Sequence, residues 1–96
     1  MPLPILTALA EPTRLAAIDI IWSGKEYCVC ELMARLNASQ SRMSRHMAVL
    51  KAAGLLVDRR DAQWVRYRRN PDLSGDAVQL VDATLALIHS EQRGAA

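Results

Sequence analysis

Apolar residues recur along the first third of the chain at spacings that predict short helices separated by turns. The segment Leu3 to Ala10 predicts a first helix. Glu11-Pro12 predicts the start of a second, because proline is favoured at the first helical position, and Gly24 predicts its end. From about Glu26 to Leu36, apolar residues at the i, i+3, i+4, i+7 spacing of a buried face predict a third helix.

The next segment predicts a fourth helix paired with the third. Asn37 can take a left-handed turn, and Ser39 is a good N-cap for a helix over Gln40 to Ala53, which Gly54 ends. The side chains that we expect to face the core from this helix are Met43, Met47 and Leu50. Two helices joined by a few residues, the second with a polar outer face, indicate a helix-turn-helix.

A β-hairpin is predicted after the helix-turn-helix. Its strands are Leu55 to Arg60 and Gln63 to Arg69, the latter containing tryptophan, valine and tyrosine residues that favour strand. Asp61 and Ala62 form the expected tip. This tip lacks glycine, but a turn without glycine can still form around a type I geometry.

A last helix is predicted from about Ser74 to Gln92, with an apolar stripe too wide for one small core. We expect the part around Val81, Leu85 and Ile88, together with residues 3–9, to form a two-fold dimer interface. The predicted fold class is therefore mostly α with a β-hairpin. It is a single winged helix-turn-helix domain over residues 1–96, homodimeric through its terminal helices, with 74–92 as the dimerisation helix.

Length and charge narrow the function classes. A chain of 96 residues is one domain, which excludes an enzyme that carries its own dinucleotide-binding unit plus a substrate domain. From Arg35 to Arg69 nine basic and two acidic residues give a charge of +7, whereas the remainder carries −5. A basic middle between acidic ends indicates a face for a polyanion, although charge counts alone also fit a solvated surface.

The cysteine content and the absence of long apolar runs indicate a cytoplasmic protein. No run approaches the length of a bilayer-spanning helix, and the first six residues do not resemble a secretory signal. Cys28 and Cys30, the two cysteines, are separated by one residue. A bond between them would close a small strained ring, so we expect no intrachain disulfide.

Four segments in order resemble the arsenic-repressor (ArsR/SmtB) family of small bacterial transcriptional repressors. They are Leu-Ala-Glu-Pro-Thr-Arg-Leu at 9–15, Glu-Tyr-Cys-Val-Cys-Glu-Leu at 26–32, the helix-turn-helix stretch 39–55, and Asp-Arg-Arg…Trp-Val-Arg-Tyr over 58–67. The resemblance implies a homodimer that binds double-stranded operator DNA. It also implies that DNA is released when a metal, metalloid or oxidant is sensed.

The polar face of the fourth helix supplies the candidate DNA contacts. A recognition helix places side chains near its N-terminus in the major groove, where Arg45 suits a guanine edge and Gln40 an adenine edge. We expect Arg42 and Lys51 at phosphates. The alternative is an ordinary amphipathic helix with a solvated face. The base-contacting positions that the resemblance implies are Gln40, Ser41, Ser44 and Arg45.

The hairpin supplies further candidate contacts to the DNA backbone. Arg59, Arg60 and Arg66 are the expected ones, because Asp61 at the tip disfavours phosphate contacts there. For Arg59 and Arg60 the alternative is a salt bridge with Asp58 or Asp61.

Cys28 and Cys30 are the candidate metalloid ligands. Thiolates suit soft acceptors, and the segment around them resembles the sensing motif of arsenite and antimonite repressors. On a regular helix they would flank the buried Val29, pointing about 200° apart, so one arsenic atom could bridge them only if the helix start is distorted. Met33 stands where related repressors have a third cysteine. Two thiolates suit a mono-substituted trivalent arsenical, or arsenite completed by hydroxide or a small thiol.

The histidines are assigned no ligand role. We expect His46 to be a satisfied core or interface residue, and His89 to lie at the surface or dimer interface. The zinc-sensing branch of the family carries an Asp-x-His pair on the last helix, but here Asp82 is followed by Thr84 at that spacing. A C-terminal zinc site is therefore rejected.

Together these features predict a cytoplasmic, homodimeric, arsenic-responsive repressor with no constitutive cofactor, for which trivalent arsenic is the inducer. The same thiols could instead sense cadmium, lead or oxidants. A small thiol enzyme would need an activating base beside a cysteine, and no histidine or lysine is placed for it, so we expect no enzyme. A nucleoid protein would bind DNA without regard to sequence or thiol ligands.

Overall fold

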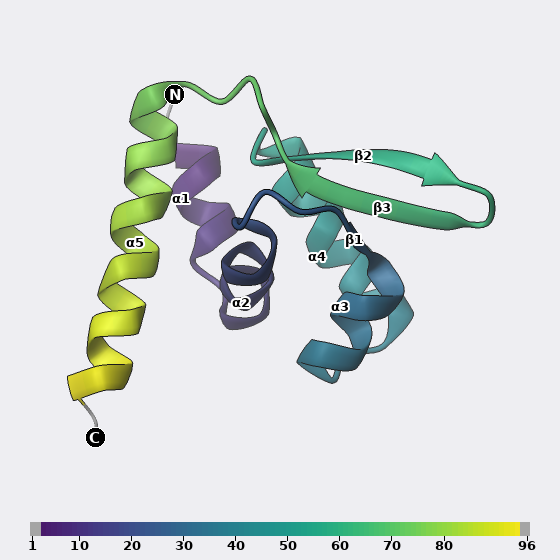
Figure 1. Cartoon of the computed structure of the whole chain (residues 1–96), viewed down its shortest axis with the longest axis horizontal. Helices are drawn as coiled ribbons and strands as arrows, with labels where there is room; N and C mark the ends of the chain where they lie inside the picture. The colour runs from purple at the N-terminus through teal and green to yellow at the C-terminus, as the bar shows by residue number, and fades with distance from the viewer. Residues whose placement is uncertain (1–2, 95–96) are drawn as a thin grey trace.

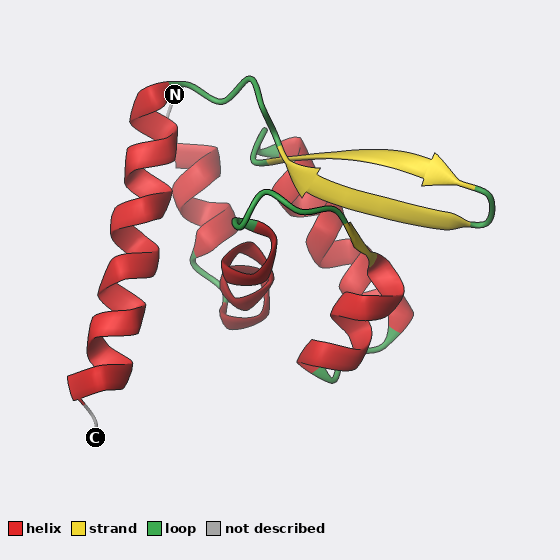
Figure 2. Ribbon diagram, in the orientation of Figure 1, coloured by secondary structure: helices red, strands yellow, loops and turns green. Residues whose placement is uncertain are grey.

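The computed structural model describes residues 3–94, which form a helical body from which a long hairpin extends (Figures 1 and 2). The mostly helical winged helix-turn-helix fold predicted from the sequence is confirmed, with one strand added to the hairpin. The elements in chain order are α1 (Leu3–Leu9), α2 (Pro12–Ile21), β1 (Tyr27–Cys28), α3 (Val29–Leu36), α4 (Gln40–Ala52), β2 (Leu56–Asp61), β3 (Trp64–Arg69) and α5 (Gly75–Gly94).

Local capping explains three helix boundaries that the sequence predicts, namely the starts of α2 and α4 and the end of α3. The Glu11 side chain accepts from the backbone N–H of Arg14 at 2.8 Å and so caps α2. Ser39 caps α4 in the same way, accepting from the N–H of Arg42 at 3.3 Å. Asn37 adopts φ 52° at the end of α3, which is the predicted left-handed turn.

The sheet has the strand order β1-β3-β2, and both pairings are antiparallel. The additional strand, β1, pairs Tyr27 with Tyr67 and Cys28 with Arg66. The third helix consequently starts at Val29 rather than near Glu26, so that boundary of the prediction is wrong. Residues 27 and 28 form a strand and not the first turn of the helix, because the unpaired edge of β3 lies beside them and accepts their backbone hydrogen bonds.

The hairpin tip differs from the prediction by one residue and by its turn type. Asp61 pairs with Trp64, which leaves Ala62 and Gln63 as the two-residue loop. Ala62 has φ 56°, whereas Gln63 has a negative φ. Positive φ at the first loop residue excludes the type I geometry that a glycine-free tip could take, and is typical of a type II′ turn, whose twist matches the strands.

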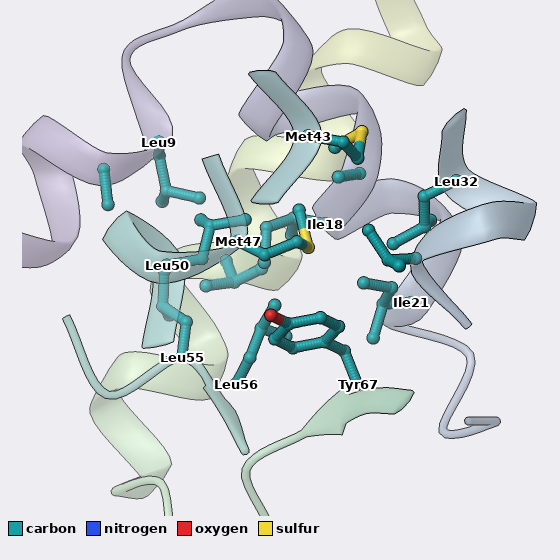
Figure 3. Close-up of a cluster of buried hydrophobic side chains, with 14 of the residues drawn as sticks. Leu9, Ile18, Ile21, Leu32, Met43, Met47, Leu50, Leu55, Leu56 and Tyr67 are labelled. Carbon is teal, nitrogen blue, oxygen red and sulfur yellow. The ribbon is translucent and has the colours of Figure 1, made fainter. Parts of the chain in front are cut away.

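An aliphatic core holds the helix-turn-helix against the sheet (Figure 3). The predicted inner face of α4 is confirmed, since Met43, Met47 and Leu50 are fully buried. Tyr67 extends from the sheet into the same cluster. The remaining large side chains that are fully buried are Ile18, Ile21, Leu32, Leu55, Leu56 and Val81.

The last helix buries one face and leaves another exposed. Val81 and Leu85 are 0% and 6% exposed within the single chain, so assigning them to a dimer interface was wrong. They pack against the chain's own core because the helix lies along the body. Outside this core, Leu87 on α5 and Leu3 and Leu6 on α1 remain exposed apolar side chains.

The positive φ of Ala62 predicts a stabilising substitution. Glycine adopts this conformation without the steric cost of a Cβ, so Ala62→Gly should raise the free energy of unfolding by about 0.5–1 kcal/mol. Urea unfolding at fixed protein concentration measures the change. As a control, Ala34→Gly in the exposed face of α3 should lower the free energy of unfolding by about 1 kcal/mol. A loss of stability in Ala62→Gly would contradict the proposed turn.

Candidate DNA-binding face and cysteine site

The exposed side of α4 carries all the residues predicted to contact bases. Burial of Met43, Met47 and Leu50 fixes the rotation of this helix, and its opposite side faces solvent. The exposed side chains near its start are Gln40, Ser41, Arg42, Ser44 and Arg45. Short serines beside a long arginine give a surface that can approach a nucleic-acid groove closely.

Three of the predicted phosphate-binding cations hold a carboxylate in this structure. Lys51 Nζ lies 3.0 Å from Asp58 of β2. Arg66 Nε lies 2.9 Å from Asp61. Arg59 makes a two-pronged contact with Glu26, with Nε and Nη2 at 2.7 and 2.6 Å from the carboxylate oxygens.

The pairing of Arg59 differs from the alternative drawn from the sequence, which named Asp58 or Asp61 as its partner. Asp58 and Asp61 bond Lys51 and Arg66 instead. Arg59 stands directly opposite Arg66 in the β2–β3 ladder, where two like charges repel. Glu26 and Asp61 offset that repulsion, one for each arginine.

The remaining predicted contacts are available to an anion. Within residues 3–94, Arg42, Arg45 and Arg60 have no ion-pair partner. All three side chains are exposed. The paired cations on the surface can also exchange partners, because an exposed salt bridge contributes only about 0–1 kcal/mol.

The Arg59–Glu26 contact changes the acidity of Glu26. The hydrogen bond from the Arg59 side chain is the largest cause that lowers the pKa of the Glu26 carboxyl below its ordinary value of 4.5. The same bond raises the pKa of the Arg59 guanidinium. Glu26 was not singled out in the sequence, since the two residues lie 33 positions apart and only the β1 pairing brings them together.

Cys28 ends β1 and caps α3. Its backbone is extended, with φ −71° and ψ 146°, and its Sγ accepts from the N–H of Cys30 at 3.3 Å. In return, the Glu31 carboxylate accepts from the N–H of Cys28 at 3.1 Å. These two bonds form a capping box in which a cysteine takes the place of serine or threonine.

This geometry overturns two expectations about the cysteines. Cys28 and Cys30 are joined as a disulfide, with Cα atoms 5.2 Å apart, so the expectation that they form no intrachain disulfide is wrong. The angular separation of about 200° applies only when both residues lie in one regular helix. Cys28 lies outside the helix, and its extended backbone directs the sulfur back towards Cys30.

The burial of the two cysteines also differs from the expected flanking positions. Cys28 is 3% exposed and belongs to the core cluster, whereas Cys30 is half-buried. Met33 on the same helix is half-buried too. A thioether is no substitute for a thiolate, so the reduced site offers two soft anionic ligands. Among residues 3–94, no group of three or more His, Cys, Asp and Glu side chains is arranged to hold a metal ion.

The cysteine site contacts both parts of the candidate DNA-binding surface. Helix α3 packs against α4, and its contacts extend to β3. Cys28 itself pairs with Arg66 of β3. A rearrangement at the two sulfurs therefore acts directly on the support of α4 and on the inner edge of the hairpin.

The histidines take internal partners. His46 on α4 lies 3.3 Å from Arg14 and 3.6 Å from Glu11, both from the start of α2, as an interface histidine should. His89 on α5 lies 3.0 Å from Asp19 of α2.

Trp22 connects three elements between which no contact is predicted from the sequence. Its indole N–H donates to Asp82 of α5 at 2.7 Å. The Arg69 guanidinium from the end of β3 lies 4.4 Å from the centre of the Trp22 ring. The hairpin, α2 and α5 therefore meet at one side chain.

A helix-turn-helix with a polar, cationic second helix, followed by a projecting hairpin, defines a winged helix-turn-helix transcriptional regulator. The sequence profile described as "Bacterial regulatory protein, arsR family" matches residues 5–57. The chain belongs to this family.

Known proteins resemble the chain over most of its length. The arsenic resistance transcriptional regulator ArsR2 of Pseudomonas putida is 45% identical over 84 residues, which cover 88% of this chain and 73% of that protein. The arsenical resistance operon repressor of Escherichia coli is 38% identical, covering 85% and 70%. These relatives are transcriptional regulators rather than enzymes.

Solved structures support the same assignment. HlyU from Vibrio cholerae superposes with a TM-score of 0.76 at 32% identity, covering 88% of each chain. A homodimeric winged helix-turn-helix DNA-binding domain from Mycobacterium bovis has a TM-score of 0.72 at 25% identity, covering 92% of this chain and 77% of that one. Over residues 3–94, no helix combines the length and apolarity required to cross a membrane.

The lowered pKa of Glu26 predicts how its contribution to stability depends on pH. A carboxyl whose pKa is depressed on folding stabilises the native state above its unfolded pKa, and the contribution is lost as pH falls through the folded pKa. Glu26→Gln should therefore lower the free energy of unfolding at pH 7, with the deficit shrinking below pH 4.5. Urea unfolding across pH measures it. Glu91→Gln, which removes an exposed carboxylate without an ion-pair partner in residues 3–94, should have little effect. A deficit independent of pH would contradict the ionic origin.

Proposed function

We propose that this chain is a cytoplasmic, homodimeric repressor that releases operator DNA when Cys28 and Cys30 bind trivalent arsenic. The observation that carries the proposal is the adjacency of the two sulfurs at the start of α3, the helix that supports α4. The names of the Pseudomonas putida and Escherichia coli relatives, both concerned with arsenic resistance, support the choice of inducer.

In the repressing state, α4 lies in the major groove and the hairpin follows the DNA backbone. Base edges are contacted from Gln40, Ser41, Ser44 and Arg45. Phosphates are bound by Arg42 and Arg60, and by Lys51, Arg59 and Arg66 once DNA replaces their carboxylate partners. This exchange is supported by the exposure of those ion pairs.

The homodimer is assembled through α1 and α5. Support comes from the exposed leucines on these helices, namely Leu3, Leu6 and Leu87, and from the homodimeric Mycobacterium bovis domain. A two-fold arrangement places the two α4 helices about 34 Å apart, one turn of DNA, and predicts an operator with an inverted repeat.

Induction starts from the reduced cysteines, because the thiolate and not the disulfide is the ligand for arsenic. An arsenic atom inserted between the two sulfurs moves the Cys28 sulfur, which accepts from the N–H of Cys30, and so weakens the cap of α3. The start of α3 shifts, and with it the support of α4. Because ligand and DNA favour different states, each lowers affinity for the other by the same factor.

The donor set favours inducers that need only two sulfurs. Arsenite takes three thiolates where they are present, and this chain has two cysteines. A mono-substituted trivalent arsenical, which already carries one carbon ligand, matches the site. Arsenite would complete its coordination with hydroxide or a small thiol.

The disulfide between Cys28 and Cys30 favours one second candidate, a repressor that senses thiol oxidants. The two candidates differ in the reagent that releases DNA. Reduced protein on its operator, challenged separately with arsenite, phenylarsenite, cadmium, lead and peroxide, distinguishes them. Release by peroxide but not by the arsenicals would replace arsenic with oxidant as the inducer.

The assignment of Arg45 to a base edge predicts a loss of specificity. Arg45→Ala should cost about 1–3 kcal/mol of specific binding and relax discrimination at one base step. Fluorescence anisotropy on the operator and on its single-base variants measures both quantities. The control is Arg93→Ala near the end of α5, which removes the same charge and should retain discrimination. Unchanged discrimination in Arg45→Ala would contradict the proposed placement of α4.

The assignment of the cysteines predicts a repressor that cannot be induced. In wild type, kept reduced with a phosphine, arsenite should raise the operator Kd by about 5- to 150-fold. Cys28→Ser and Cys30→Ser should bind the operator normally but fail to respond, because serine preserves size and removes the soft ligand. Met33→Leu, which removes a sulfur but no thiolate, is the matched control and should respond fully. X-ray absorption should count fewer than three protein sulfurs per arsenic. Full release from the double serine variant would overturn the sensing proposal and leave DNA binding intact.

A further inference from the structure

A hollow of about 210 Å³ lies between the start of α2 and one flank of α4. It opens beside the exposed face of α4 that carries the proposed base contacts. The hollow could not be predicted from the sequence, because its two walls come from segments about 30 residues apart. The residues that line it are Glu11, Arg14, Arg42, Arg45, His46 and Val49.

The lining is strongly cationic. Three arginines face one carboxylate, and Arg42 and Arg45 have no ion-pair partner within residues 3–94. Glu11 is occupied as the cap of α2 through its bond to the N–H of Arg14. Burial is the largest single influence and raises the pKa of Glu11, but backbone hydrogen bonds from Arg14 and Thr13, together with the charges of His46 and Arg14, lower it overall. With this carboxyl ionised and His46 neutral, the lining still carries two net positive charges.

Arg14 is a fixed part of the wall. Its Nε donates to the carbonyl of Ala8 at 2.7 Å, and a terminal nitrogen donates to the carbonyl of Thr7 at 3.3 Å. Both carbonyls belong to the last turn of α1, so the guanidinium is held in place by backbone. Its charge is therefore a permanent feature of the hollow rather than that of a mobile side chain.

The surroundings of His46 Nδ1 favour an N–H at the other ring nitrogen. A terminal nitrogen of Arg14 lies 3.3 Å from Nδ1, and the Glu11 carboxylate lies 3.6 Å from it. Arginine only donates, so a neutral ring that takes this bond accepts at Nδ1 and carries its proton on Nε2, and a charged ring has a proton on Nε2 as well. Within residues 3–94, His46 Nε2 has no hydrogen-bond partner. The hollow therefore combines an imidazole N–H donor with flexible cationic donors.

We propose that this hollow binds one backbone phosphate of the operator, held by Arg42 and His46 Nε2–H beside the fixed charge of Arg14. The proposal rests on the proposed DNA-binding function and extends it from α4 and the hairpin to the start of α2. A phosphodiester oxygen is an acceptor with negative charge, which matches donors of this kind. Arg45 also lines the hollow, but its side chain is exposed and so remains available to a base edge.

Neutral-phosphate scanning tests the proposal. Operator duplexes each carry one methylphosphonate, which removes the charge of a single phosphate, and their Kd is compared with that of unmodified DNA. For the wild-type protein, a methylphosphonate at one position in each half-site, the phosphate that the hollow binds, should raise the Kd about tenfold. Arg42→Gln should bind unmodified operator about tenfold more weakly and should lose its sensitivity at that same position. The effects of Arg42→Gln and of the methylphosphonate on the binding free energy are then non-additive at that position and additive at the other positions.

Two further variants separate the phosphate contact from folding and from net charge. His46→Phe keeps a planar ring but has no N–H, so it should also lose part of the sensitivity at that position, with a circular dichroism spectrum like that of wild type. Arg68→Gln on the exposed side of β3 removes the same charge away from the hollow and should keep full sensitivity there.

The outcomes distinguish this proposal from the one on which it rests. If Arg42→Gln remains fully sensitive at every methylphosphonate position, the hollow holds no phosphate, although operator binding stands. If wild type does not bind operator above unrelated DNA, the proposed function fails and this site fails with it. If Arg68→Gln, and not Arg42→Gln, loses the sensitivity to the methylphosphonate at that position, the phosphate is bound by the hairpin and the proposed site in the hollow is wrong.

Discussion

The chain passes from sheet to helix at Cys28, and both the backbone and the side chain of this residue are fixed there. Its backbone pairs with Arg66 of β3, while its sulfur caps α3. Chemistry at this sulfur therefore acts on the residue that caps α3. Because α3 packs against α4, we expect a shift at the start of α3 to alter the support of the exposed helix.

The arginines of α4 and those of the hairpin differ in whether a carboxylate of the chain pairs with them. Arg42 and Arg45 on α4 have no carboxylate partner in residues 3–94, whereas Arg59 and Arg66 in the hairpin each hold one. Without those carboxylates, two arginines directly across a strand pair would repel each other. A polyanion along the hairpin would screen the same repulsion. The internal ion pairs therefore stabilise the free hairpin without blocking a nucleic acid from replacing them.

Features set by local chemistry were predictable, and features set by distant partners were not. The boundaries of α4 follow from the Ser39 cap and its periodic core residues, which lie within a few positions of each other. By contrast, β1 is two residues long and exists only because β3 offers an edge 38 to 40 positions later, as the pairings of Tyr27 with Tyr67 and of Cys28 with Arg66 show. That distant edge moved the start of α3, and so changed the predicted relation between Cys28 and Cys30.

Strand β3 also connects the cysteine site to the last helix. Arg66 pairs with Cys28 near the middle of the strand, and Arg69 at its end stacks on Trp22, whose indole bonds Asp82 of α5. Since α5 carries the exposed Leu87 that we assign to the dimer, these contacts connect the sulfurs with the proposed interface. A dimer that binds two half-sites must keep its two α4 helices at the spacing of the DNA turn. On the proposed mechanism, we therefore expect movement of β3 to oppose DNA binding twice, once through the hairpin and once through the distance between subunits.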